Sequence, residues 1–164
     1  MTDTGFFKTL KRFALISLCV VIADMITKQI ALNTLFDPPQ IIQLTSFLNL
    51  VPVWNEGISF GMFSDFPELT KWGVIVLAFV VIGWLISELR YSGGLQQFGA
   101  ACIAGGALGN VLDRIRFNKV VDFLDFHLAG YHWPAFNLAD SAIFVGVICW
   151  VYAMLNAIRP VEDE

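Results

Sequence analysis

Long apolar stretches alternate with polar connections along the 164 residues of this chain. Four of them approach the roughly 20 residues that an α-helix needs to cross about 30 Å of hydrocarbon. They run over residues 13–32, 72–89, 95–112 and 138–158. The pattern predicts an all-α polytopic membrane protein with four transmembrane helices, folded as a single domain over residues 1–164.

The third stretch differs from the others because it is rich in glycine and alanine. Ala101, Gly105 and Gly109 recur at every fourth position, and residues four apart lie on one face of a helix. Small residues let helix backbones approach closely in a membrane. We therefore expect the third helix to lie at the centre of the bundle.

The two long connections, residues 33–71 and 113–137, are too long and too aromatic to be simple turns. Aromatic rings suit the boundary between membrane and water. Residues 41–54 contain short β-prone pieces interrupted by Pro52, which predicts a small strand-containing element. We place this element on the extracytoplasmic surface.

Composition strengthens the membrane assignment, because 57% of the residues are hydrophobic and only 15% are charged. The net charge of −4 and the lack of a large basic patch exclude nucleic-acid binding. The ten basic residues, counted together, are divided evenly between the two sides of the predicted spans. The first helix, which follows Lys8, Lys11 and Arg12, decides the orientation and predicts that both termini are cytoplasmic.

The cysteines and the amino-terminal segment add no further chemistry. Cys19, Cys102 and Cys149 each fall inside an apolar stretch, where we expect buried thiols and no disulfide. The basic start is not followed by an A-x-A-like cleavage site. We therefore expect the first helix to be an uncleaved span.

Polar side chains within or beside the spans are the candidates for function, because ionisable groups are costly at membrane depth. Asp24 is the first of them. It is four residues from Lys28, so either an ion pair between the two or a role beside a site explains it. Asn55 and Gly57 lie in the aromatic sequence WNEGISFG, which can also be an ordinary turn.

The third helix ends in GGALGNVLDR, where Asn110, Asp113 and Arg114 come together. The two charged residues can simply anchor the helix end at the interface. Asp122 follows in an apolar segment, and we expect the neighbouring Asp125 to face water instead.

Asp140 lies in the first turn of the fourth helix. With Asn137 three residues earlier, it also resembles a helix-capping box. His127 and His132 do not match zinc-ligand spacing, so neither a metal nor another cofactor is expected.

In their order along the chain, these motifs resemble those of the bacterial lipoprotein signal peptidases, the type II signal peptidases. The resemblance covers nearly the whole chain. It rests on Asp24 with Thr27 and Lys28, Asn55-x-Gly57 with Phe60, the Gly106–Arg114 block, VVDF at 120–123 and FNLAD at 136–140. Ile58 and Ser59 depart from the small residues that are usual after Gly57.

The resemblance implies an aspartic peptidase of the bacterial inner membrane that acts near the periplasmic face, and we expect it to be a monomer. Its substrate is a diacylglyceryl-modified prolipoprotein in the membrane lipid, cut before the lipidated cysteine. Asp122 and Asp140 are then the catalytic pair. The substrate-binding or site-shaping residues are Asp24, Asn55, Gly57, Asn110, Arg114 and Asn137, with Lys28 and Asp113 as structural support.

Physical chemistry independently favours such a pair. Two nearby carboxylates do not both ionise cheaply, so one serves as an acid and the other as a base. We expect Asp140 to be the charged member, because the amino end of a helix stabilises an anion. We also expect the aromatic loop over residues 60–66 to cover the site.

Two other classes of protein are also compatible with this sequence. A small transporter or proton channel also carries intramembrane Asp and Arg, although no inverted repeat is visible. A non-catalytic membrane scaffold is the third reading, in which the polar residues only cap helices. Both alternatives tolerate Asp122→Asn, whereas a peptidase does not.

Overall fold

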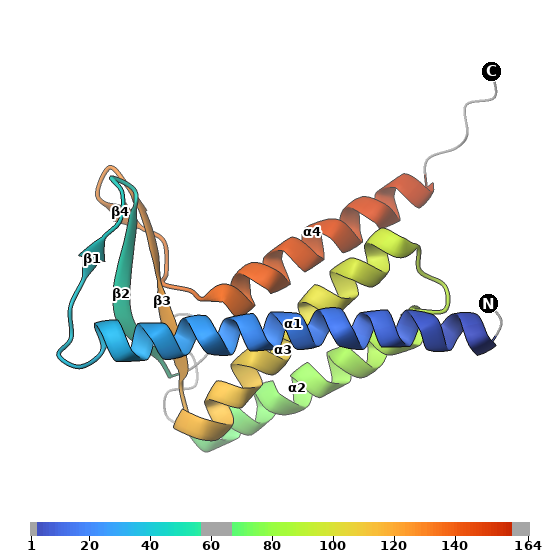
Figure 1. Cartoon of the computed structure of the whole chain (residues 1–164), viewed down its shortest axis with the longest axis horizontal. Coiled ribbons are helices and arrows are strands. Elements are labelled where there is room, and N and C mark those ends of the chain that lie inside the picture. The colour runs from blue at the N-terminus through green and yellow to red at the C-terminus, as the bar shows by residue number, and fades with distance from the viewer. Residues whose placement is uncertain (1–2, 57–66, 159–164) are drawn as a thin grey trace.

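The computed structural model describes residues 3–56 and 67–158. The helices are α1 (Asp3–Leu35), α2 (Pro67–Glu88), α3 (Gly94–Phe117) and α4 (Leu138–Ile158). The strands are β1 (Ile42–Gln43), β2 (Leu48–Asn55), β3 (Val120–Leu128) and β4 (Tyr131–His132). Figure 1 shows the strands together at one end of the helices, with the start of α1 and the end of α4 at the other.

Three helices of the described part of the chain are long and apolar enough to cross a membrane. They cover residues 3–35, 68–88 and 138–156, in agreement with the first, second and fourth predicted spans. Their large apolar side chains point outward. Leu15, Val76 and Phe144 are each at least 60% exposed, as expected of helices whose surroundings are lipid.

Helix α3 packs against each of the other three helices, which confirms its predicted central position. Its crossing with α4 depends on two glycines. A Cβ on Gly99 would lie 2.6 Å from the Gly146 carbonyl oxygen, and one on Gly146 would lie 2.6 Å from that of Gly99. Towards α1, a Cβ on Gly105 would lie 2.7 Å from the carbonyl oxygen of Ser17.

The strands form one antiparallel sheet in the order β1-β2-β3-β4. The pairing of β2 with β3 runs from Leu48 opposite Phe126 to Asn55 opposite Val120, with an irregularity between Leu50 and Val53. Pro52 lies in this irregularity, where no ladder hydrogen bond is needed from it. The predicted strand-containing element is therefore present.

The sequence did not reveal β3, which appeared only as an apolar segment after the third helix. Its first residues, from Val120 to Phe123, are all buried, so the alternation of polar and apolar positions that marks a half-exposed strand is missing. Val121 and Phe123 pack with Ala31 and Leu35 of α1. This contact fixes the sheet against the end of α1.

Candidate active site

Asp122 lies on β3 and is 1% exposed. Its two carboxylate oxygens accept hydrogen bonds from two amides. Asn55 Nδ2, at the end of β2, donates to Oδ2 at 2.9 Å. Asn137 Nδ2, just before α4, donates to Oδ1 at 2.7 Å. The pairing of β2 with β3 thus brings Asn55 to a carboxylate that is 67 residues away in the sequence.

Asp140 lies in the first turn of α4 and takes part in the predicted capping box. Its N–H donates to Asn137 Oδ1 at 3.0 Å, and the Asn137 N–H donates to Asp140 Oδ2 at 3.2 Å. The other oxygen, Oδ1, accepts a hydrogen bond from Asn110 Nδ2 of α3 at 2.7 Å. The cap and the polar cluster are therefore made of the same residues.

Asn137 joins the two aspartates, since its side chain donates to Asp122 and its backbone N–H to Asp140. The side chain is fully buried. Burial above all, with a smaller contribution from the nearby charge of Asp140, raises the pKa of Asp122 to about 6 against the opposing hydrogen bonds from Asn55 and Asn137. The geometry thus brings together one carboxyl that favours its proton and a second carboxylate with two hydrogen-bond donors.

A buried cluster of charged residues lies next to this pair and contacts it through Asn110. Lys28 Nζ lies 2.8 Å from Asp24 Oδ2 and 2.9 Å from Asp113 Oδ2, and it donates to Asn110 Oδ1 at 3.0 Å. All three charged residues are at most 4% exposed. The ion pair between Asp24 and Lys28 that the sequence left open is therefore formed.

Asp24 also lies next to the candidate site. Its Oδ1 accepts the backbone N–H of Ala139, between Asn137 and Asp140, at 2.9 Å. Asp113 plays a similar part for β3, because its Oδ2 accepts the N–H of Val121 at 3.1 Å. Each of the two carboxylates thus holds the backbone beside one member of the aspartate pair.

Arg114 supplies positive charge near the pair. Its guanidinium donates from Nη1 to the carbonyl oxygen of Asn110 at 3.2 Å and interacts electrostatically with Asp140, Asp122 and Asp113. Gly57, and the aromatic residues 60–66 expected to cover the site, lie outside the described residues. The structure thus gathers every described residue predicted for the site.

The prediction for Asp125 was wrong, because this side chain does not face water. It is 6% exposed, and it accepts hydrogen bonds from Asn49 Nδ2 at 3.0 Å and from His132 Nδ1 at 2.8 Å. Burial opposes ionisation, but these hydrogen bonds lower the pKa of Asp125 overall. Since β3 was not recognised, nothing in the sequence signalled that β2 and β4 would cover this position.

Two contacts at the site carried no direct signal in the sequence. The backbone N–H of Ala139 binds Asp24, and Gly109 faces the same carboxylate so closely that a Cβ would lie 2.5 Å from Asp24 Oδ2. The repeat of small residues predicted that the third helix packs closely against its neighbours, but it did not predict which group would contact Gly109. That partner is a carboxylate.

Comparisons with known proteins give a consistent result. The family model for signal peptidase (SPase) II matches residues 16–156. Curated lipoprotein signal peptidases are similar over most of their length. One from Desulforapulum autotrophicum is 40% identical over 152 residues, which are 90% of this chain and 94% of the relative. One from Burkholderia vietnamiensis is 46% identical over 149 residues, covering 88% and 87%.

A solved structure described as a bacterial membrane enzyme has a similar fold. Its TM-score is 0.77 at 28% sequence identity, and the match covers 94% of each chain. The likeness therefore includes the sheet as well as the helices.

Proposed function

Because the chain belongs to the signal peptidase II family and is an aspartic endopeptidase, a lipoprotein signal peptidase, we propose that Asp122 and Asp140 are its catalytic pair. The observation that carries this assignment is the bridge through Asn137, which hydrogen-bonds both carboxyl groups. Lys28 also joins two carboxylates, those of Asp24 and Asp113, but its ammonium group supplies a counter-charge to them, whereas Asn137 is neutral.

The substrate is a diacylglyceryl-modified prolipoprotein, and cleavage removes its signal peptide before the lipidated cysteine. Such a substrate is held in the membrane by its signal peptide and its acyl chains. The enzyme therefore needs its pair close to the membrane surface. Asp122 lies in the sheet and Asp140 in the first turn of an apolar helix, and this supports a position of the pair near the membrane surface.

The proposed reaction is a direct attack by water. The oxygen of the water molecule bonds to the scissile carbonyl carbon while Asp140 takes a proton from that water. Asp122 donates its own proton to the carbonyl oxygen. The resulting diol then collapses. Asp140 passes its proton to the leaving nitrogen as the C–N bond breaks, and Asp122 recovers a proton from a diol hydroxyl. No covalent enzyme intermediate forms, and no cofactor takes part.

The neighbouring polar groups hold this pair and the substrate in place. The amides of Asn55, Asn110 and Asn137 orient the carboxyl groups. Arg114 and Gly57 bind or shape the path of the substrate backbone. Three charged residues support the pair indirectly, because they bind the backbone N–H groups and the amide that position it. These residues are Asp24, Asp113 and Lys28.

We also propose that α3 is a fourth span. Figure 1 shows α2 running away from the sheet and α3 returning towards it. Helix α3 is then the return crossing, and its polar residues face the other helices rather than lipid. Both termini lie in the cytoplasm of a bacterial cell, and the sheet and the aspartate pair lie at the periplasmic face of the inner membrane. The basic residues that precede the first span support this orientation.

Cleavage of a diacylglyceryl-modified prolipoprotein by the purified protein in detergent tests the assignment. We expect Asp122→Asn and Asp140→Asn to abolish cleavage while thermal stability stays near that of the wild type. Asp125→Asn is the matched control, since this carboxylate lies on the same strand but bonds His132 and Asn49. It should retain cleavage.

Activity that survives in either catalytic variant would exclude the pair as the chemical centre. The polar cluster would then be structural, as a transporter or a scaffold requires. Loss of activity in Asp125→Asn at unchanged stability would instead indicate that Asp125 takes part in the reaction.

A further inference from the structure

The outer face of α1 combines apolar and basic side chains in one continuous stripe. Leu15, Leu18 and Ile22 are 62%, 54% and 47% exposed. Lys8, Lys11 and Arg12, about one turn nearer the amino end, are also exposed. At 3.6 residues per turn these positions share one side of the helix. Its buried residues, such as Phe13 and Ser17, point the other way.

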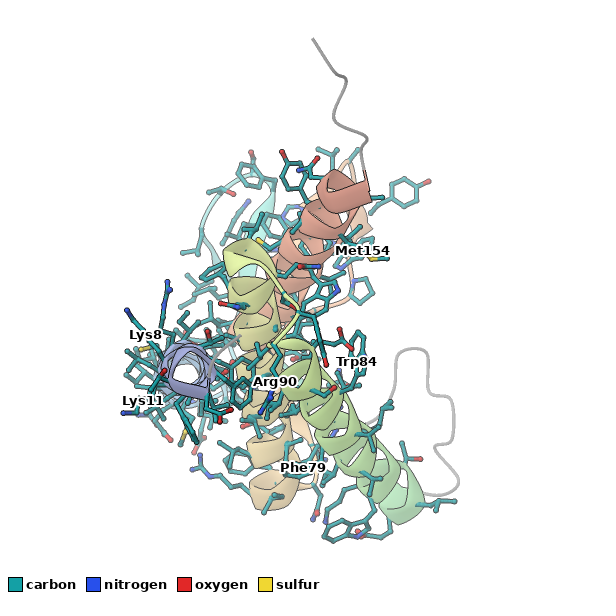
Figure 2. The ribbon with its side chains drawn as sticks, turned by 90° about the vertical axis from the view of Figure 1, so that its right-hand side faces the viewer. Lys8, Lys11, Phe79, Trp84, Arg90 and Met154 are labelled. Carbon is teal, nitrogen blue, oxygen red and sulfur yellow. The ribbon has the colours of Figure 1, made fainter. Side chains whose placement is uncertain are left out.

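These three basic side chains make no ion pair or hydrogen bond with any residue of the ranges 3–56 and 67–158. Figure 2 shows Lys8 and Lys11 projecting away from the other helices, while Arg90 lies between α1 and α2. Arg90 already has a partner, since its guanidinium lies 4.3 Å from the centre of the Phe6 ring. Lys8, Lys11 and Arg12 are thus available to a ligand outside the protein.

Exposed positive charge occurs at the amino end of α1 but not at its carboxyl end. The exposed polar residues there are neutral, namely Gln29, Asn33 and Thr34. The one cation in this region, Lys28, is buried and paired with Asp24 and Asp113. Positive charge on the outer face of α1 is therefore confined to a single membrane surface.

We propose that this face of α1 binds an anionic phospholipid. Its phosphate accepts hydrogen bonds from Lys8, Lys11 and Arg12, and one acyl chain lies along Leu15, Leu18 and Ile22. Long basic side chains reach from an apolar helix face to the headgroup level, and clusters of them beside a span attract anionic lipid. A zwitterionic phospholipid fills the apolar part of the face but leaves the excess positive charge unbalanced.

Native mass spectrometry of the full-length protein in detergent can test this proposal. The probe is an equimolar mixture of phosphatidylglycerol and phosphatidylcholine with identical acyl chains. We expect the wild type to retain phosphatidylglycerol preferentially. Each basic residue near an anionic surface contributes about fivefold, so we expect K8Q/K11Q/R12Q to reduce this preference by at least about tenfold.

Arg116→Gln is the matched control, because Arg116 is an exposed cation in the last turn of α3, at the sheet end of the bundle. It should leave the lipid preference unchanged. Cleavage measured in phosphatidylcholine micelles should be equal in all three proteins, since none of these cations contacts the aspartate pair. Loss of binding therefore stays distinguishable from failure of the proposed catalytic assignment.

A triple variant that still prefers phosphatidylglycerol would overturn the proposal. So would displacement of the lipid by an equal concentration of glycerol phosphate, because the apolar face would then contribute nothing. A second measurement needs no variant. The preference of the wild type should weaken as salt is raised from 50 to about 500 mM, as screening of an exposed charge requires, and a preference insensitive to salt would also count against it.

Discussion

Asn137 donates its side-chain amide to Asp122 at 2.7 Å while its own side-chain oxygen caps α4 by accepting the N–H of Asp140. One residue thus starts a helix and joins the two carboxyl groups. Losing it should affect stability and activity through different atoms, so substitutions can separate the two effects.

We expect Asn137→Ala to lower kcat by at least about a hundredfold, because the bridge between the two carboxyl groups is lost. Stability should fall by about 1 kcal/mol with the cap. Asn137→Ser restores a capping oxygen but has no amide to reach Asp122. Its thermal stability should approach that of the wild type while kcat stays low. Recovery of both quantities in the serine variant would show that capping is the whole role.

The rate of cleavage should depend on the protonation of Asp122. Its raised pKa of about 6 means that the carboxyl group holds its proton below that pH and loses it above. If this proton reaches the carbonyl oxygen, kcat/KM falls as the pH rises through about 6.

The Asn55→Ala variant tests the origin of this pH dependence. The Asn55 amide favours the carboxylate form of Asp122, so its removal should move the basic limb of the profile to higher pH. A limb that stays in place in this variant would assign the titration to another group. The measurement is kcat/KM at constant ionic strength.

Gly109→Ala should destabilise the folded protein by about 1–3 kcal/mol through overpacking. The added Cβ would lie 2.5 Å from Asp24 Oδ2 and 3.3 Å from the Cβ of Ala139. Cleavage should fall too, because Asp24 holds the backbone beside Asp140. Gly83→Ala on α2 is the control, since nothing lies within 4 Å of its Cβ position. It should be neutral or slightly stabilising, and equal effects of the two substitutions would refute the contact.

Lys28→Met should cost about 3–5 kcal/mol in the free energy of unfolding, because it leaves Asp24 and Asp113 buried without a counter-charge. Lys71→Met is the comparison. Its ion-pair partner Glu68 is 71% exposed and lies 3.7 Å away, and the hydrogen bond of Lys71 to Asn118 Oδ1 is also exposed, so the loss should stay below about 1 kcal/mol. Unfolding in detergent, followed by tryptophan fluorescence, measures both. A small effect at Lys28 would contradict the stabilising role of its ion pairs with Asp24 and Asp113.

The sequence predicted the helices well because lipid leaves few alternatives to long apolar segments. Three of the four predicted spans match helices that are apolar enough to cross a membrane. The central place of α3 followed from its small residues, which allow three neighbours to approach. The strand β3 was missed because its start is buried on both faces, so no alternating pattern exists there.

The described residues that cluster around Asp122 and Asp140 could be listed from the sequence, but the contacts that connect them could not. The motif resemblance named Asn110, Asn137 and Asp140 without showing that one amide joins α3 to α4. Asn137 and Asp140 look like an ordinary capping box in the sequence, and they do form one. A capping residue can also belong to a functional site if another functional side chain lies beside it. Here that side chain is Asp122, on a strand that the sequence did not reveal.

The bond between Asp24 and the N–H of Ala139 joins residues 115 positions apart, and this has a consequence for biosynthesis. Asp24 is synthesised before its partner, which arrives only when α4 is being inserted. A nascent chain that stops between Asp122 and Asn137 contains the first aspartate but lacks both Asp140 and the bridging Asn137. If the proposed pair is catalytic, proteolytic competence begins only once residues 137–140 have been synthesised and inserted, so nascent chains that stop short of them cannot cut lipoproteins in the membrane.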